Sequence, residues 1–97
     1  MNRLLYLSED DRYLILQAAA IAGVEHSGWE ENPFDPEYAH NGIPALKVDG
    51  WWWNPLVDSY DALHLAVKLK LRVDFSRLTG DDVLSAARRA IVQAVVI

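Results

Sequence analysis

Residues 51–75 read WWWNPLVDSYDALHLAVKLKLRVDF, and this stretch decides the fold. It predicts the end of an aromatic strand, a turn at Asn54-Pro55 and a helix that begins after Asp58. A second strand is expected over residues 71–76, where apolar and polar side chains alternate. The rest of the chain is expected to cover this unit.

The predicted central helix is almost entirely apolar. From residue 62 to residue 69 only His64 and Lys68 are polar, and together with Asp61 they form one narrow stripe at helical spacing. A helix of this composition is expected to be largely buried. Asp58 and Asp61 stand three residues apart and are expected to cap its N-terminus.

Two further helices are predicted on either side. The first covers residues 9–22, with Ser8 as its N-cap and Gly23 as the left-handed residue that closes it. The last begins after Thr79 and continues to the end of the chain, with Val83 in its core stripe.

A strand is predicted over residues 45–53, and period two divides its side chains between two faces. Leu46, Val48 and Trp52 are expected to point inward. The other face carries Ala45, Lys47, Asp49, Trp51 and Trp53. A short strand within residues 24–29 is also expected, and residues 30–42 are expected to form a long acidic loop because turn signals replace the periodicity.

The fold class that follows is α+β: a small, mostly antiparallel sheet with three helices. The 97 residues fit one domain with one core, spanning residues 1–97. Hydrophobic residues make up 52% of the chain, which excludes a disordered chain.

Charge and composition exclude several classes of protein. The net charge is −5, and residues 1–61 carry eleven acidic but only three basic side chains, which argues against direct binding of nucleic acid. The chain has no cysteine, so disulfides and thiolate metal sites are excluded. The first apolar run is too short for a signal peptide, and no stretch approaches the roughly eighteen apolar residues of a membrane span. We therefore expect a cytoplasmic protein of a bacterial host cell, with no membrane partner.

No catalytic, cofactor or metal site is predicted. The serines and histidines do not stand in a strained nucleophile motif, no glycine-rich phosphate loop is present, and the acidic residues lack the spacing of a calcium loop. His64 invites a pH-switch interpretation because histidine titrates near neutrality. A half-exposed helix residue is the simpler interpretation.

Three segments resemble a family of small phage and prophage proteins that carry the phage ABA sandwich domain. They are Trp52-Trp53-Asn54-Pro55-Leu56, residues 61–69 and residues 88–92. The resemblance implies an α/β/α sandwich and a phage or prophage origin, and it carries no settled biochemical role. The sequence departs from the pattern at Tyr60 and Lys70, where the family usually has glycine, and at His64, where it usually has arginine.

The strongest sequence signal for function is aromatic, since seven of the ten aromatic residues fall between Trp29 and Tyr60. Aromatic residues dominate binding hot spots, although they also fill the cores of small domains. The alternation predicts a partner-binding face with an acidic rim, which suits a basic partner. Its expected members are Trp51, Trp53, Lys47, Asp49, Glu30, Glu31, Asp35 and Glu37.

These observations predict a non-enzymatic phage or prophage accessory protein that binds another protein and needs no cofactor. One alternative is an inhibitor of a host defence or nucleic-acid-binding system that acts through its acidic face. Another is an oligomeric structural or assembly subunit that associates through the apolar end Val95-Val96-Ile97. A small hydrolase is a third alternative.

Overall fold

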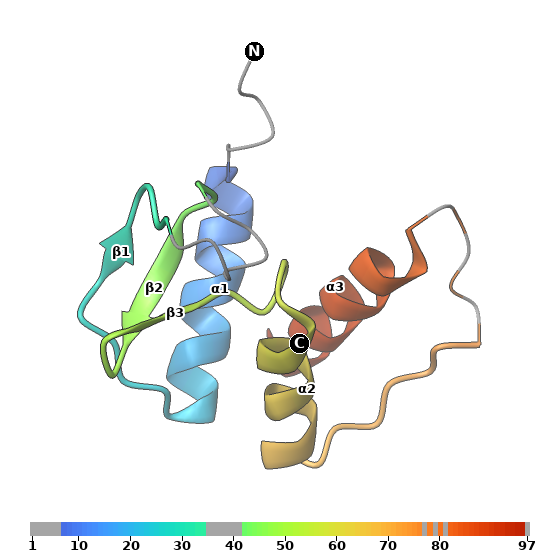
Figure 1. Cartoon of the computed structure of the whole chain (residues 1–97). Coiled ribbons are helices and arrows are strands. Elements are labelled where there is room, and N and C mark those ends of the chain that lie inside the picture. The colour runs from blue at the N-terminus through green and yellow to red at the C-terminus, as the bar shows by residue number, and fades with distance from the viewer. Residues whose placement is uncertain (1–6, 35–41, 77, 79, 81, 97) are drawn as a thin grey trace.

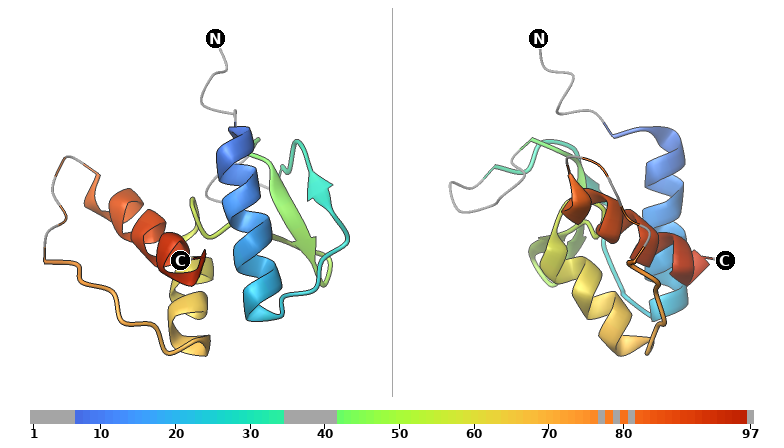
Figure 2. Two further views of the ribbon diagram at one scale, coloured as in Figure 1. Left: turned by 180° about the vertical axis from the view of Figure 1, so that it is seen from behind. Right: turned by 90° about the vertical axis from the view of Figure 1, so that its right-hand side faces the viewer.

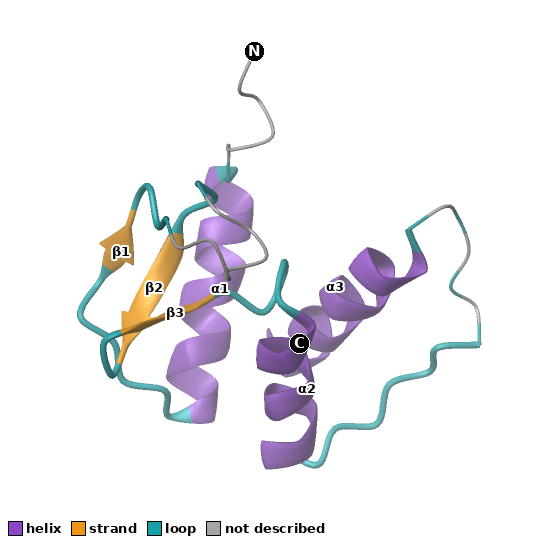
Figure 3. Cartoon of the chain, viewed as in Figure 1, coloured by secondary structure: helices purple, strands orange, loops and turns teal. Residues whose placement is uncertain are grey.

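The computed structural model describes residues 7–34, 42–76, 78, 80 and 82–96. Within them the chain forms three helices and a three-stranded sheet (Figure 1), and Figure 3 distinguishes helices, strands and loops by colour. This confirms the predicted α+β class. The elements are α1 (Glu9–Ala22), β1 (Trp29–Glu30), β2 (Ala45–Val48), β3 (Trp51–Trp53), α2 (Ser59–Lys68) and α3 (Val83–Val96).

Helix α1 begins and ends where the sequence predicts. Oγ of Ser8 accepts a hydrogen bond from the backbone N–H of Asp11 at 3.1 Å, which satisfies one of the free amides of the first turn. At the other end Gly23 has a φ of 71°, and its N–H donates to the carbonyl of Ala20. The N–H of Val24 reaches back to the carbonyl of Ala19 at 2.8 Å, which completes a Schellman motif.

Strands β2 and β3 form a hairpin, so the single strand predicted over residues 45–53 is wrong. Asp49 and Gly50 make a two-residue turn with φ of 53° and 80°. Positive φ at both positions is the requirement of the type I′ hairpin turn, for which Asp-Gly is a preferred pair. The pairing across the turn is Leu46 with Trp53, Lys47 with Trp52 and Val48 with Trp51.

The sheet is antiparallel throughout, in the order β1-β2-β3. Strand β1 pairs with β2 by placing Trp29 opposite Leu46 and Glu30 opposite Ala45. It therefore begins at the end of the segment over which a short strand was predicted.

Helix α2 begins at the predicted cap but is less buried than predicted. Oδ1 of Asp58 accepts from the N–H groups of Tyr60 and Asp61 at 2.8 and 3.2 Å. The expectation of a largely buried helix is wrong, because Leu63 and Val67 are 59% and 68% exposed. Only one side of α2 packs against the rest of the chain.

Residues 71–76 run in an extended path toward α3 but do not form the predicted strand (Figure 1). A strand requires a partner for its backbone groups, and these residues pair with no strand among the described ones. Oδ1 of Asp74 instead accepts from the N–H and Oγ–H of Ser76 at 2.9 and 2.6 Å. This local turn competes with strand pairing.

Helix α3 begins later than predicted. Oδ1 of Asp82 accepts from the N–H of Ser85 at 3.0 Å, the geometry of an N-cap, whereas the predicted cap Thr79 lies outside the described residues. Val83 was expected in the core and is 47% exposed, while Val92 is fully buried.

The core lies between one face of the sheet, α1, and the pair α2 and α3. Figure 2 shows α1 along that face, and its right-hand view shows α3 passing in front of both α1 and α2, against which it packs. Small side chains on α1 permit this close approach. The buried cluster comprises Leu7, Ile15, Ala18, Ala19, Ala22, Leu46, Trp53, Leu56, Ala62, Leu65, Ile91, Val92 and Val95.

Polar contacts from α3 fix the helices relative to one another. The guanidinium of Arg89 makes two hydrogen bonds to the carboxylate of Asp11 on α1, at 3.0 and 2.9 Å, and this contact raises the pKa of Arg89. Arg88 donates to the carbonyl of Leu56 at 2.9 Å and to Oγ of Ser59 at 3.0 Å. These contacts hold α3 on α1 and on the turn that leads into α2.

Candidate functional site

The hairpin separates residues that were predicted to share one binding face. Because the two-residue turn reverses the chain, Trp51 and Trp53 lie on the same face as Leu46 and Val48. Trp53 is only 6% exposed and belongs to the core, so its assignment to the surface is wrong. Trp51, near the tip of the hairpin, is 53% exposed as expected.

Lys47 lies on the other face of the sheet from Trp51. Its ammonium group is 5.7 Å from the centroid of the Trp52 ring, within the range of a cation–π contact. Trp52 was expected inside and is half-buried. The predicted grouping of Lys47 with Trp51 and Trp53 is therefore also wrong.

The predicted acidic rim is only partly present at the hairpin. Asp49 is exposed in the turn itself. Glu31 makes two hydrogen bonds to Arg12 of α1, at 3.0 and 2.8 Å, and this contact lowers the pKa of Glu31. Arg12 also lies 4.9 Å from the ring of Trp29, so Glu31 belongs to a structural contact between α1 and β1. Glu30 is half-buried in β1, and Asp35 and Glu37 lie outside the described residues.

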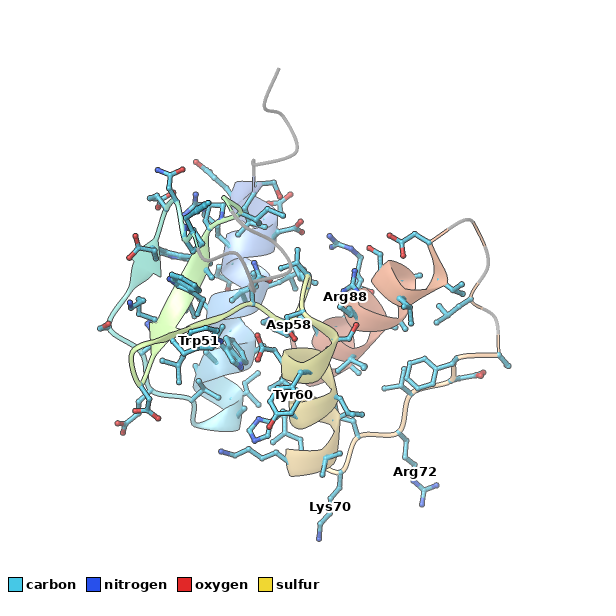
Figure 4. All side chains as sticks on the ribbon, viewed as in Figure 1. Trp51, Asp58, Tyr60, Lys70, Arg72 and Arg88 are labelled. Atoms are coloured by element: carbon cyan, nitrogen blue, oxygen red, sulfur yellow. The ribbon has the colours of Figure 1, made fainter. Side chains whose placement is uncertain are left out.

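The structure forms a pocket of about 450 Å³ beside α2, which we call the α2 pocket. The end of α1, the hairpin and one side of α2 make its walls, and Figure 4 shows Trp51 of the hairpin on the same side of the molecule as Tyr60 of α2. Its lining residues are Gly23, Val24, Glu25, Val48, Asp49, Trp53, Tyr60, Asp61, His64 and Lys68.

Asp61 is the buried acid of the α2 pocket, with an exposed fraction of 9%. Its Oδ2 accepts a hydrogen bond from the backbone N–H of Asn54 at 2.9 Å. Burial raises the pKa of Asp61 to about 6, which the bond from Asn54 opposes and the nearby carboxylate of Asp58 reinforces. The predicted capping role of Asp61 is therefore replaced by a contact with the hairpin.

Asn54 is fully buried and makes use of all its polar groups. Its Nδ2 donates to the carbonyl of Pro44 at 2.9 Å, and its Oδ1 accepts from the N–H of Leu56 at 3.0 Å. Its carbonyl accepts from the N–H groups of Val57 and Asp58, which shapes the turn into α2. The Trp-Asn-Pro-Leu segment is thus a turn between β3 and α2 that is held by hydrogen bonds of Asn54.

The remaining polar residues of the α2 pocket are not arranged as a catalytic group. The ring of His64 stacks on that of Tyr60, with centroids 6.5 Å apart, and no side-chain hydrogen bond joins His64 to another described residue. The lining contains no serine, threonine or cysteine. The pocket therefore offers no serine, threonine or cysteine nucleophile for His64 to activate.

The outer side of α2 presents a strip of large apolar side chains, which we call the α2 apolar strip. Tyr60, Leu63 and Val67 follow one another at helical spacing and are 75%, 59% and 68% exposed. Because His64 and Lys68 are on the adjoining side of the same helix, the strip and the α2 pocket are neighbours.

Sequence reasoning placed three residues of this pocket on one side of a helix but predicted no site there. It grouped Asp61, His64 and Lys68 correctly, because their spacing places them on one side of a helix. It named Asp49 as a member of the predicted binding face but not as a neighbour of α2, and it did not select Glu25. Both residues come from other segments, and no local pattern marks them as neighbours of α2. The Asp-Gly turn was the one available signal for the position of Asp49.

The chain matches no family model, no curated protein and no solved structure. The resemblance to the phage ABA sandwich family therefore stays a prediction. Among the described residues, no group of three or more His, Asp or Glu side chains is placed to hold a metal ion. In the same part of the chain, no helix has both the length and the apolar character to cross a membrane.

Proposed function

We propose that this chain is a non-enzymatic protein-binding domain, an accessory protein of phage or prophage type, and that its partner docks on α2. The observation that carries the proposal is the α2 apolar strip. Three large side chains, Tyr60, Leu63 and Val67, stand in solvent on one side of a short helix.

The fold does not need these side chains on the outside of α2. Ala62 and Leu65 already bury the inner side of the helix, and Leu65 is fully buried. Exposing adjacent apolar groups to water is unfavourable, and a partner that covers them stabilises the complex by removing that surface from water. Tyrosine adds a rigid surface that loses little conformational entropy on binding.

The α2 pocket supports binding rather than catalysis. Its acidic and basic groups come from three segments of the chain and line a cavity open to a partner. Trp51 stands exposed at the nearby hairpin, so aromatic side chains flank the pocket from two elements. Apolar anchors beside a polar rim are the common anatomy of a protein interface.

The test is affinity capture from a bacterial lysate with three proteins in parallel: the wild type, the double variant Leu63→Ser/Val67→Ser, and the control Ile21→Ser. Ile21 is a 51% exposed apolar residue on α1, so the control also removes an exposed apolar side chain. We expect the double variant to lose at least about 2 kcal/mol of binding to the captured protein, the scale of a hot spot. The control should bind as the wild type does.

Sedimentation velocity over a range of concentrations completes the experiment, because a second copy of the chain is another way to cover the strip. A concentration-dependent dimer that the double variant abolishes would identify the partner as a second copy. Equal capture by the wild type and the double variant, with both monomeric, would show that α2 is not the docking surface.

A further inference from the structure

The α2 pocket has a negative electrostatic potential from two sources, its carboxyl groups and the C-terminal end of α1. Three carboxyl groups line it, those of Glu25, Asp49 and Asp61, against the single ammonium group of Lys68. The pocket also includes Gly23 and Val24 at the C-terminal end of α1, where the helix dipole places partial negative charge. The last turn of α1 has no basic side chain to neutralise that charge.

Asp61 supplies a hydrogen-bond acceptor inside this pocket. It is about nine-tenths buried, and its Oδ2 is occupied by the N–H of Asn54. Among the described residues, Oδ1 has no hydrogen-bond donor. Oδ1 is not among the buried polar atoms that lack a partner, so it is accessible and can accept a hydrogen bond from a bound molecule.

The aromatic residues indicate which cationic hydrogen-bond donor suits the α2 pocket. Trp53 and Tyr60 both line the α2 pocket, so a ligand that reaches Asp61 passes aromatic surface on its way. A guanidinium group stacks on aromatic rings and offers several N–H donors in one plane. An ammonium group is more strongly hydrated and cannot make that planar contact.

We propose that the α2 pocket receives one arginine side chain of the protein that docks on α2. The guanidinium donates to Oδ1 of Asp61, and Glu25 and Asp49 add favourable charge at the mouth of the pocket. This inference rests on the proposed protein-binding function and specifies the chemistry of its partner. Lys68 opposes binding of the guanidinium group, because its ammonium group carries the same charge.

The inference is tested without the partner, by NMR titration of the full chain with small probes at low ionic strength. The probes are N-acetyl-arginine methylamide, its lysine counterpart and its citrulline counterpart, which has the shape of arginine without the charge. The indole N–H of Trp53 and the side-chain carboxyl carbon of Asp61 report on the pocket. We expect saturable shifts with the arginine probe and a lowered pKa of Asp61 in its presence.

Matched variants identify the contact. Asp61→Asn should lower the affinity for the arginine probe by at least about tenfold, which corresponds to 1.4 kcal/mol. The control Glu9→Gln, an exposed acid in the first turn of α1, makes the same change in net charge and should leave the affinity unchanged. Lys68→Met should raise the affinity for the arginine probe, because it removes a like charge from the lining.

Four outcomes would overturn the inference. The first is the absence of a saturable shift with the arginine probe up to about 50 mM, a concentration at which even binding weaker than 1 mM is visible. The others are equal affinity for the citrulline or lysine probe, unchanged affinity in Asp61→Asn, and weaker binding in Lys68→Met, which would indicate an anionic ligand. Each leaves the capture experiment on Leu63 and Val67 untouched. Loss of capture in that double variant without probe binding would retain the docking surface and reject the arginine site.

Discussion

The backbone N–H of Asn54 donates to Oδ2 of Asp61 over 2.9 Å, and this bond ties the end of the hairpin to the first turn of α2. Asn54 is fully buried and Asp61 lines the α2 pocket. The position of the pocket wall on α2 thus depends on a residue that follows β3 directly. The same bond partly offsets the cost of holding a carboxyl group away from water.

Replacing Asn54 with alanine should destabilise the fold by about 2–3 kcal/mol. The change removes the partners of the Pro44 carbonyl and the Leu56 N–H, which are buried groups that water cannot reach without disrupting the turn. Urea denaturation followed by circular dichroism measures the loss. Asn32→Ala is the control, because Asn32 is exposed, and its free energy of unfolding should change by less than about 0.5 kcal/mol. Equal stabilities of the two variants would contradict the structural role of Asn54.

Asp61 should make the stability of the protein depend on pH. Its pKa is about 6 in the folded chain against 3.8 for an ordinary aspartate, so the folded state binds more protons between these values. Its contribution to stability is therefore largest below pH 3.8 and falls as the pH rises to about 6. The shift corresponds to at most about 3 kcal/mol, and partial solvent screening reduces this to about 1–2 kcal/mol.

Asp61→Asn should remove that fall in stability, because asparagine does not ionise and its oxygen still accepts from Asn54. Urea denaturation of both proteins at several pH values between about 4 and 7 measures the difference in slope. The variant should be more stable than the wild type at pH 7. Parallel pH profiles would mean that Asp61 has an ordinary pKa.

The helix ends were predictable because their signals are local. Ser8, Gly23 and Asp58 each act on amides or carbonyls within four residues, so the sequence around them suffices. The hairpin was mispredicted although its signal is equally local. Asp49-Gly50 was treated as part of a strand, and one missed turn moved Trp53 from the core to the surface.

The burial of α2 and the composition of the α2 pocket depend on tertiary packing. An apolar composition predicts that α2 has a buried side, which Leu65 confirms, but it does not say how many neighbours cover the helix. Leu63 and Leu65 have the same side chain and opposite environments. Glu25 and Asp49 join Asp61 only through the path of the chain between elements.

The two tryptophans of β3 that share a face should respond differently to truncation. Trp53→Ala should cost about 3–5 kcal/mol, because it leaves a cavity in the core. Trp51→Ala should cost less than about 1 kcal/mol, since its side chain is 53% exposed. Thermal melts of both variants provide the comparison. A Trp51→Ala variant that unfolds as readily as Trp53→Ala would place both rings in the core.

Leu65→Asp should prevent folding, because an unpaired charge would be forced into a fully buried position. Leu63→Asp is the matched variant on the same helix, and we expect it to fold, with a change in stability of less than about 1 kcal/mol. Circular dichroism and a thermal melt distinguish the two. A cooperative melt for Leu65→Asp would mean that the inner side of α2 is not buried.

Lys70 offers a site at which a single substitution should stabilise the fold. It has a φ of 53° and occupies the left-handed position after α2, where the N–H of Leu71 donates to the carbonyl of Ala66 at 2.9 Å. Gly23 fills the equivalent position after α1 at no steric cost. A lysine held in this conformation is strained, whereas glycine is not.

We expect Lys70→Gly to raise the free energy of unfolding by about 0.5–1 kcal/mol, which is the strain relieved less the greater freedom of glycine in the unfolded chain. The side chain itself contributes little, because it points away from the fold (Figure 4) and no described residue bonds to it. Arg72→Gly is the control: it removes the same charge from an exposed residue whose φ is not positive, and should not stabilise. Gly23→Ala should lower stability by about 1 kcal/mol through the backbone alone, since an added Cβ meets no atom within 4 Å. Urea denaturation of the three variants gives the order of their free energies of unfolding. A Lys70→Gly variant less stable than the wild type would show that the lysine side chain supports the end of α2.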